Sequence, residues 1–341
     1  MKNKGKFLLI PAAILLLGGC SPTAKTNIPR GYSIVDPTDA NARNAFFAKV
    51  SNDIAITYEK GSDGFKVKGA FGFDEVSYTD GQDYVKIMDA EMDFVIAVDG
   101  FAQGAKSAEA MVEISDLGFK FEAFNSSKNK KQTLKVSGVD ATAYYTDNKI
   151  YLDLSDKDLK NATYGIIDLA FDGNVNAEAN VRNAKEQADR FLTKILIEDN
   201  YVVDDVEDVF PSSNYKISSK DIADLTKVMS GAFEEILKND SLKNLVTLSE
   251  DKDSNGAAIR VALASEPVKI DGANVSGNAA ALLSFDKDGV MDNIGLAGNA
   301  RIADAKGKEV IEVKKANLAV SFEYGSNLVK LPSFNGYSPL N

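Results

Sequence analysis

The fold is decided by residues 65–98, which read FKVKGAFGFDEVSYTDGQDYVKIMDAEMDFVIAV. Apolar residues recur at every second position on both sides of a turn at Asp80-Gly81. Charged residues such as Lys66, Asp74 and Glu91 fill the positions between them. A period of two is typical of strands that have one buried face and one face in water. This stretch therefore predicts two neighbouring strands of an antiparallel sheet.

The same alternation continues along the chain. A strand is expected at 108–124, with a bulge at Asp116-Leu117-Gly118 because the apolar parity changes there. A hairpin with its turn at Asp147-Asn148 follows, and a second one turns at residues 286–289, which end in glycine. The remaining expected strands cover 245–249, 257–264, 275–285, 290–302 and 310–324, with an edge segment at 329–334.

Three segments instead show apolar residues at steps of three and four, which predicts helices. The first runs from 38 to 59, with Thr38 as its N-cap. The second begins near Asn174 and covers about six turns. The third begins at Ser218, where Asp221 completes a capping box. An acidic and apolar loop at 198–217 is expected between the last two helices.

Together these elements predict an α+β fold. We expect a broad curved antiparallel sheet of about ten strands, half-barrel-like, because wide twisted sheets tend to curl. The N-terminal helix and two long central helices would lie on its concave face. Residues 37–341 are expected to form one domain; the alternative is two lobes divided between 165 and 215.

The N-terminal residues predict where the protein is located in the cell. Lys2, Lys4 and Lys6 precede an apolar run of about eleven residues, too short for the roughly 20 that cross a bilayer. The run ends in Leu17-Gly18-Gly19-Cys20, which resembles the bacterial lipobox. This resemblance implies removal of residues 1–19 as a signal peptide and a diacylglycerol on Cys20. Residues 20–36 would be a flexible tether. The protein would lie on the extracytoplasmic side of the bacterial cell membrane or outer membrane.

Composition excludes several classes of function. The chain has no histidine, no tryptophan and one cysteine, so histidine-dependent catalysis and histidine zinc sites are excluded. Removal of the first nineteen residues leaves 36 basic and 50 acidic residues, a net charge of −14. Such a charge disfavours nucleic acid and anionic lipid as electrostatic partners. We expect no enzymatic activity and no cofactor.

The candidate ligand surface consists of aromatic and methionine side chains on the predicted strands. These side chains either belong to a filled core or line an apolar cavity in a half-closed sheet, which would suit acyl chains. They are Phe71, Phe73, Met88, Met92, Phe94, Phe119, Phe121 and Phe322.

Two groups of oxygen-bearing side chains are candidates for other chemistry. Asp251, Asp253 and Asn255 begin like a calcium loop, but Ala262 stands where a bidentate acid is needed, and a polar hairpin turn is the alternative. The three acids at positions 89, 91 and 93 are interpreted as separate solvated carboxylates rather than a catalytic pair.

Three stretches carry a resemblance to a known group of proteins. Residues 144–155, 283–296 and 329–332, together with the order of lipobox, tether, helix and broad sheet, resemble lipoprotein carriers of the LolA and LprG/LppX type. The resemblance implies a half-barrel whose apolar cavity holds lipid or lipoprotein acyl chains. The predicted function is thus a membrane-anchored lipoprotein that binds a hydrophobic ligand without catalysis. The alternative is an envelope-surface structural or protein-interaction lipoprotein without a ligand cavity.

Overall fold

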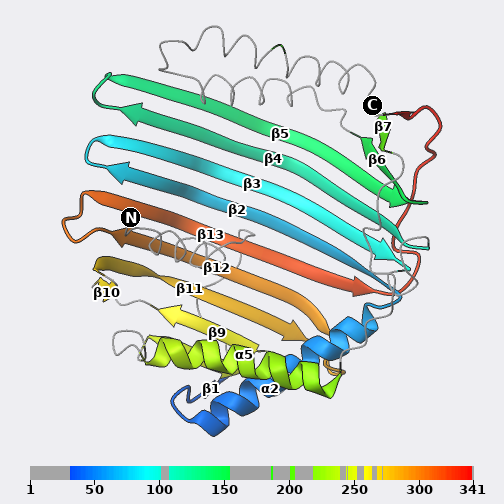
Figure 1. Ribbon diagram of the computed structural model, residues 1–341, viewed down its shortest axis with the longest axis horizontal. Helices are drawn as coiled ribbons and strands as arrows, with labels where there is room; N and C mark the ends of the chain where they lie inside the picture. Colours follow the sequence, from blue (N-terminus) through cyan, green and yellow to red (C-terminus); the bar gives the residue numbers. More distant parts are fainter. Residues whose placement is uncertain are drawn as a thin grey trace, which may run out of the picture. The chain divides into compact units, whose positions relative to one another are not determined.

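A computed structural model describes residues 31–100, 107–153, 186, 200–203, 218–238, 243, 245–251, 257–262, 267–270 and 272–339. These residues form fourteen strands and two helices (Figure 1). The helices are α2 (Ala40–Lys60) and α5 (Ser219–Leu237). The strands are β1 (Ser33–Val35), β2 (Gly64–Asp80), β3 (Asp83–Asp99), β4 (Glu109–Asn125), β5 (Lys130–Thr146), β6 (Lys149–Asp153), β7 (Asn200–Val203), β8 (Val246–Glu250), β9 (Ala257–Ala262), β10 (Val268–Ile270), β11 (Ala273–Phe285), β12 (Met291–Ala303), β13 (Glu309–Tyr324) and β14 (Ser338–Pro339).

The coarse prediction of an α+β fold built on a broad antiparallel sheet is confirmed. The residues group into two compact units that do not follow chain order. Unit 1 comprises 1–61, 69–84 and 216–323, and unit 2 comprises 62–68, 85–215 and 324–341. Strand β2 contributes residues to both. Whether 37–341 folds as one domain or as two lobes stays a prediction.

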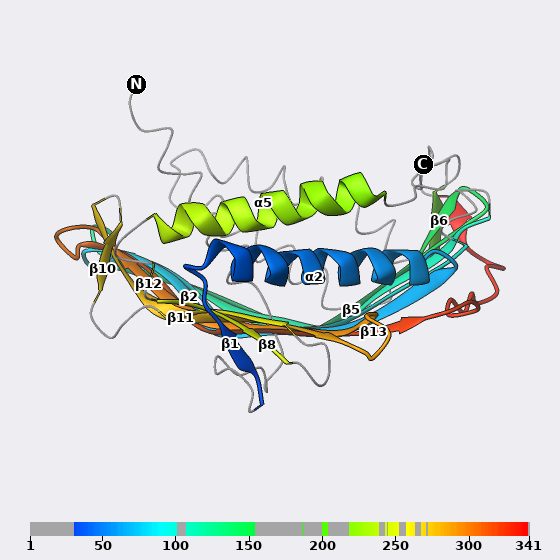
Figure 2. The same cartoon turned by 90° about the horizontal axis from the view of Figure 1, so that it is seen from below.

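In unit 1, a layer of strands is covered on one side by helices. The strand order is β1-β8-β9-β11-β12-β13-β2, and β10 pairs with β11. Helices α2 and α5 lie side by side on one side of these strands (Figure 2). Their apolar side chains meet the strands in a core that includes Phe47, Phe233, Leu248 and Phe285. Phe47 is 2% exposed, and its ring lies 5.5 Å from that of Phe233, so it joins the two helices to one core.

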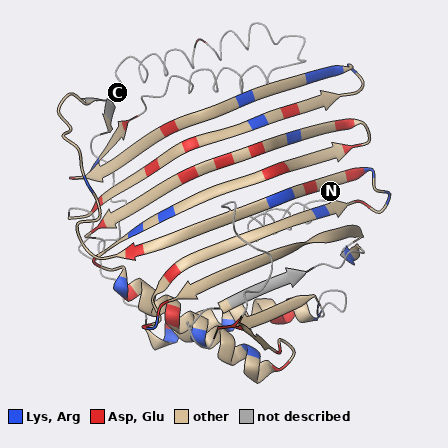
Figure 3. Cartoon of the chain, turned by 180° about the vertical axis from the view of Figure 1, so that it is seen from behind, with Lys and Arg blue, Asp and Glu red and all other residues tan. Residues whose placement is uncertain are grey.

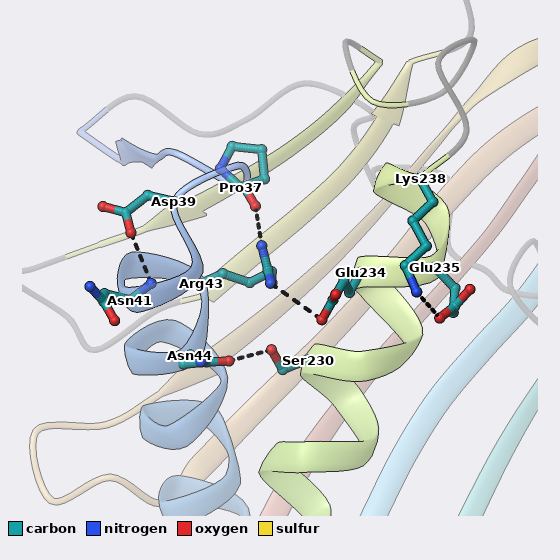
Figure 4. A network of polar contacts seen from close by, with 9 residues as sticks. All are labelled: Pro37, Asp39, Asn41, Arg43, Asn44, Ser230, Glu234, Glu235 and Lys238. Carbon is teal, nitrogen blue, oxygen red and sulfur yellow. Dashed lines mark hydrogen bonds and ion pairs between the residues drawn. The ribbon is translucent and has the colours of Figure 1, made fainter.

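Polar contacts fix the register between the two helices of unit 1 (Figure 4). The Arg43 guanidinium donates to the carbonyl of Pro37 at 2.8 Å and lies 3.7 Å from the Glu234 carboxylate. At the next residue of α2, the side-chain oxygen of Asn44 accepts a hydrogen bond from the hydroxyl of Ser230, which lies one turn before Glu234 on α5. Because Arg43 is buried, these partners are what make its charge tolerable between the helices.

In unit 2, the strand order is β3-β4-β5-β6-β7-β14. The pairs β4–β5, β5–β6 and β6–β7 are antiparallel, and the pair β7–β14 is parallel. The predicted bulge is confirmed, because the β4–β5 register shifts at Leu117 and Asp116 has a φ of 54°. The predicted turn between β5 and β6 is confirmed as well. Asp147 and Asn148 have φ values of 51° and 57°, which is the backbone of a type I′ turn.

Two further turn and cap predictions are confirmed in unit 1. Gly289 has a φ of 80°, and the Asp286 carboxylate accepts from the amides of Asp288 and Val290 at 2.9 Å. Ser218 is the N-cap of α5, and Asp221 completes the capping box.

Three local predictions were wrong. The N-cap of α2 is Asp39 rather than Thr38, because Thr38 donates both its amide and its hydroxyl to Asp36. Residues 329–334 form no strand, and the C-terminal edge strand is β14. Part of the expected loop at 198–217 is strand β7, which pairs with β6. The helix predicted from Asn174 lies outside the described residues, apart from Glu186, which is helical.

Candidate functional site

The eight residues of the candidate ligand surface all lie on strands, and all are half-buried. Phe71, Phe73 and Phe322 belong to unit 1, and the other five belong to unit 2. They differ in this respect from core aromatics such as Phe47 and Phe285, each of which is 2% exposed. The candidate surface therefore lies at the margin of the core rather than in its centre, with one patch of residues in each unit.

The unit 2 patch is best defined on the β4–β5 hairpin. Phe119 lies opposite Val136, and Phe121 lies opposite Leu134. Residues two apart in a strand share a face, and directly paired residues do too. These four side chains therefore form one continuous apolar face. Phe119 and Leu134 pack against the buried pair Val136 and Val139.

The opposite face of the same hairpin is charged. Lys120 and Glu122 alternate with the two phenylalanines, and each forms an ion pair. Lys120 lies 2.6 Å from Asp89 of β3, and Glu122 lies 2.7 Å from Lys131 of β5. Figure 3 shows acidic and basic residues interspersed along these strands. One face thus has the chemistry of a water-exposed surface, and the other has the chemistry of a surface that binds apolar groups.

On β3, Met92 and Phe94 are two residues apart and share a face. Met88 is separated from them by Asp89, which has a φ of 50°. A strand residue in this left-handed conformation interrupts the alternation. Sequence periodicity alone therefore does not place Met88 on the face of Met92.

The unit 1 patch is smaller. Phe71 and Phe73 have ring centroids 5.7 Å apart at an interplanar angle of 80°, an edge-to-face pair. Phe322 of β13 packs against the core below α2 and α5. Phe322 therefore forms the rim of that core, whereas the Phe71–Phe73 pair is a separate contact.

The oxygen-bearing side chains that are candidates for other chemistry do not assemble into a site in the described residues. Asp89, Glu91 and Asp93 are exposed, and Asp89 is paired with Lys120. Asp253 and Asn255 lie outside the described residues, and Asp251 is half-buried. No group of three or more Asp, Glu, His or Cys side chains is placed to hold a metal in the part of the chain that the structure describes.

Sequence reasoning missed two polar features. Asp53 of α2 is 7% exposed, and its Oδ2 atom has no hydrogen-bond partner among the described residues. Burial raises the pKa of this carboxyl, while Lys49 and Asn52 lower it in part. In unit 2, the Asp99 carboxylate accepts a hydrogen bond from the Val329 amide at 2.7 Å. Neither could be found from periodicity, because both depend on contacts between distant segments.

An aromatic cluster near the C-terminus was also missed. Phe334 stacks on Tyr151 with centroids 3.7 Å apart, and it makes edge contacts with Tyr144 and Tyr337. Burial, followed by the nearby Asp153 carboxylate, raises the pKa of both Tyr144 and Tyr337. Tyr144 and Tyr151 are paired across β5 and β6, which the hairpin signal predicted, but the aromatic residues of the tail carry no comparable signal.

Cys20 and the tether to residue 30 lie outside the described residues. None of the helices in the described ranges is long and apolar enough to span a bilayer.

Comparisons with known proteins give no family assignment. No protein-family model matches the chain, and no curated protein matches its sequence. Among solved structures, the outer membrane protein OprG from Pseudomonas aeruginosa shares 8% identity over 77% of this chain and 95% of its own, with a TM-score of 0.17. The dehydratase domain of the polyketide PpsC from Mycobacterium tuberculosis shares 12% identity over 89% of this chain and 97% of its own, with a TM-score of 0.12. At these TM-scores, neither likeness carries an argument about fold or function.

Proposed function

We propose that the protein is a lipoprotein anchored through Cys20 on the extracytoplasmic side of a bacterial membrane, and that it binds a hydrophobic ligand without catalysis. The ligand class that fits best is lipid, including the acyl chains of other lipoproteins. The observation that carries the proposal is the apolar face of the β4–β5 hairpin, where Phe119 and Phe121 are half-buried opposite Val136 and Leu134.

Half-burial leaves part of each phenylalanine ring in contact with water. Large apolar side chains gain about 1.5–3 kcal/mol each when they leave water completely. Phe119 and Phe121 do not reach full burial in the protein alone, although polar and charged side chains occupy the other face of the strand. A flexible hydrocarbon ligand that covers both rings would complete their burial.

The proposal extends to the fold. The antiparallel strands and the helices on one side of unit 1 support a half-barrel-like sheet with helices on its concave face, as in LolA and LprG/LppX type carriers. In such an arrangement, the aromatic and methionine positions of each patch would lie on the apolar face that binds the ligand in its own unit. Anchoring would depend on the acyl chains of Cys20, because the mature net charge of −14 gives no electrostatic attraction to anionic lipid.

Two experiments test this function. The first measures incorporation of labelled palmitate into the full-length protein in a bacterium, with Cys20→Ala as the control that must lose the label. The second titrates the purified protein with a fatty acid whose fluorophore brightens in apolar surroundings. Phe121→Ser is expected to weaken binding by about tenfold or more, since it removes one apolar contact. Lys120→Ser, its neighbour on the charged face, is the matched control. Equal affinities for the two variants would reject the β4–β5 face as the site.

A further inference from the structure

The C-terminal segment of unit 2, residues 325–339, forms a strap with a firmly held root. The Gly325 amide donates to the carbonyl of Gly64 at 3.1 Å. Four residues later, the Val329 amide donates to the Asp99 carboxylate at 2.7 Å, and Val329 is 8% exposed. A hydrogen bond to a charged acceptor is about twice as strong as one between neutral groups. The root is therefore fixed to the ends of β2 and β3.

The tip of the strap is held differently. The Phe334 ring stacks on Tyr151 of β6 at an interplanar angle of 13°, and Tyr337 contacts both rings edge-on. Beyond them, β14 extends the sheet in parallel, with Ser338 opposite Tyr201 and Pro339 opposite Val202. The tip is thus attached by one group of rings and a strand of only two residues, one of them a proline without an amide hydrogen.

The connection between root and tip has little to hold it. Lys330, Pro332 and Ser333 are exposed, and Leu331 is half-buried. Residues 330–334 form no regular secondary structure. Short parallel pairing at the last strand of a sheet is weak, and such an edge is a ready template for another strand.

We propose that the tip of the strap is displaceable, and that the surface it covers is a docking site for an extended polypeptide segment bearing an aromatic side chain. This surface consists of the ring face of Tyr151, the Tyr144 ring and the backbone edge of β7. The inference does not depend on lipid binding, which is assigned to other strand faces.

The nature of the partner follows from the present occupant. The strap tip enters as an extended chain, places one aromatic ring on Tyr151 and pairs its backbone with β7. A segment from another protein with the same two features reproduces the ring stack on Tyr151 and the backbone pairing with β7. Strand addition of this kind takes its affinity from main-chain hydrogen bonds and its specificity from side-chain sites.

The strap tip competes with an external peptide for the same site, so it lowers the apparent affinity of that peptide. A tethered segment acts at an effective concentration in the millimolar range, so it masks the site from a weak external peptide. Loss of the Phe334 ring removes the stack and lowers this competition. External peptide should then bind more tightly, although nothing has been added to the site.

The test uses the full chain and a fluorescein-labelled peptide with the sequence of residues 330–341, KLPSFNGYSPLN, followed by fluorescence anisotropy. We expect Phe334→Ala to bind it at least tenfold more tightly than the parent, with Phe334→Leu between them. Adding Tyr151→Ala to Phe334→Ala should abolish binding, and a peptide with alanine in place of its phenylalanine should not bind. Equal binding by the parent and Phe334→Ala, or no binding by Phe334→Ala, would overturn the proposal.

A second measurement does not depend on variants. Amide hydrogen exchange of the parent should show faster exchange at Tyr337 and Ser338 than at Val329, because the tip opens while the root stays closed. Equal protection of the tip and the root would show a fixed strap, and it would overturn the proposal as well.

Discussion

Gly64 is a position in unit 2 where one added methyl group should strongly destabilise the fold. A Cβ on Gly64 would lie 2.5 Å from the carbonyl oxygen of Gly325, 2.6 Å from Asp99 Oδ1 and 2.8 Å from the carbonyl oxygen of Val98. Real Cβ contacts keep to 3.0 Å or more, so the Gly325 carbonyl would have to move by about 0.5 Å. The variant Gly64→Ala should therefore separate the root of the strap from β2 and β3.

The magnitude follows from the hydrogen bonds at this point. The bond from the Gly325 amide to Gly64 is worth about 1 kcal/mol, and the charged bond from the Val329 amide to Asp99 is worth about 2 kcal/mol. Loss of both gives a decrease in the free energy of unfolding of about 3 kcal/mol. This is within the range found when a well-packed interior is overfilled.

The matched control is Gly118→Ala. Gly118 is also a buried strand glycine of unit 2, and neither glycine has a positive φ. Its Cβ would meet nothing closer than 3.6 Å. The expected effect is neutral, or stabilising by about 0.4–1 kcal/mol, because alanine restricts the unfolded chain. Urea unfolding followed by the near-ultraviolet circular dichroism of tyrosine measures both variants without interference from tryptophan. If Gly64→Ala and Gly118→Ala unfold at the same urea concentration, the contacts described at Gly64 do not exist.

Three further predictions concern unit 1. Phe47→Ala should lower the free energy of unfolding by about 3–5 kcal/mol, because it opens a cavity between α2, α5 and the strands. Val228 is 67% exposed, so Val228→Ala should change the free energy of unfolding little. Similar urea midpoints for the two variants would contradict the core described around Phe47. Ser218→Ala should lower the free energy of unfolding by about 1 kcal/mol, because it removes the N-cap of α5, and Ser219→Ala is the control. If the two variants lose helicity equally on heating, the capping box does not stabilise α5. Burial raises the pKa of Asp53 in the folded state, so its contribution to stability is complete below the ordinary carboxyl pKa and is lost as the pH rises through the raised value. Asp53→Asn should therefore flatten the decline in unfolding free energy from pH 4 to pH 7; parallel profiles for parent and variant would refute the assignment.

Local chemistry in the sequence was enough to predict the turns and one cap. The dipeptide Asp147-Asn148, the glycine at 289 and the Ser218–Asp221 pair each meet a backbone requirement within a few residues of themselves. Period-two alternation likewise located the long strands, because a strand with one wet face displays its register in its own side chains.

The missed elements depend on distant partners. Strands β1, β7 and β14 have two to four residues each, which is too few to show a period. They form because β8, β6 and β7 respectively offer an edge. The N-cap of α2 was misplaced by one residue because Asp36 captures Thr38. The contacts among Gly64, Asp99 and Val329 join segments that are far apart in the chain, so no local sequence pattern predicts them.

The same limit applies to the candidate ligand surface. The sequence identified the apolar positions, but only the β4–β5 register shows that Phe119 and Phe121 meet Val136 and Leu134 on one face. The half-burial of Phe119 and Phe121 is also visible only in the structure, since alternation alone does not separate residues in the core from residues at the margin of the core.

Native mass spectrometry of the protein purified from a bacterium tests the central claim most directly. We predict a bound species with the mass of a lipid or fatty acid, in addition to the acyl chains on Cys20, that is reduced in Phe121→Ser and retained in Lys120→Ser. A protein that carries no mass beyond its own acylated chain, and takes up none when lipid is supplied, would contradict the proposed function.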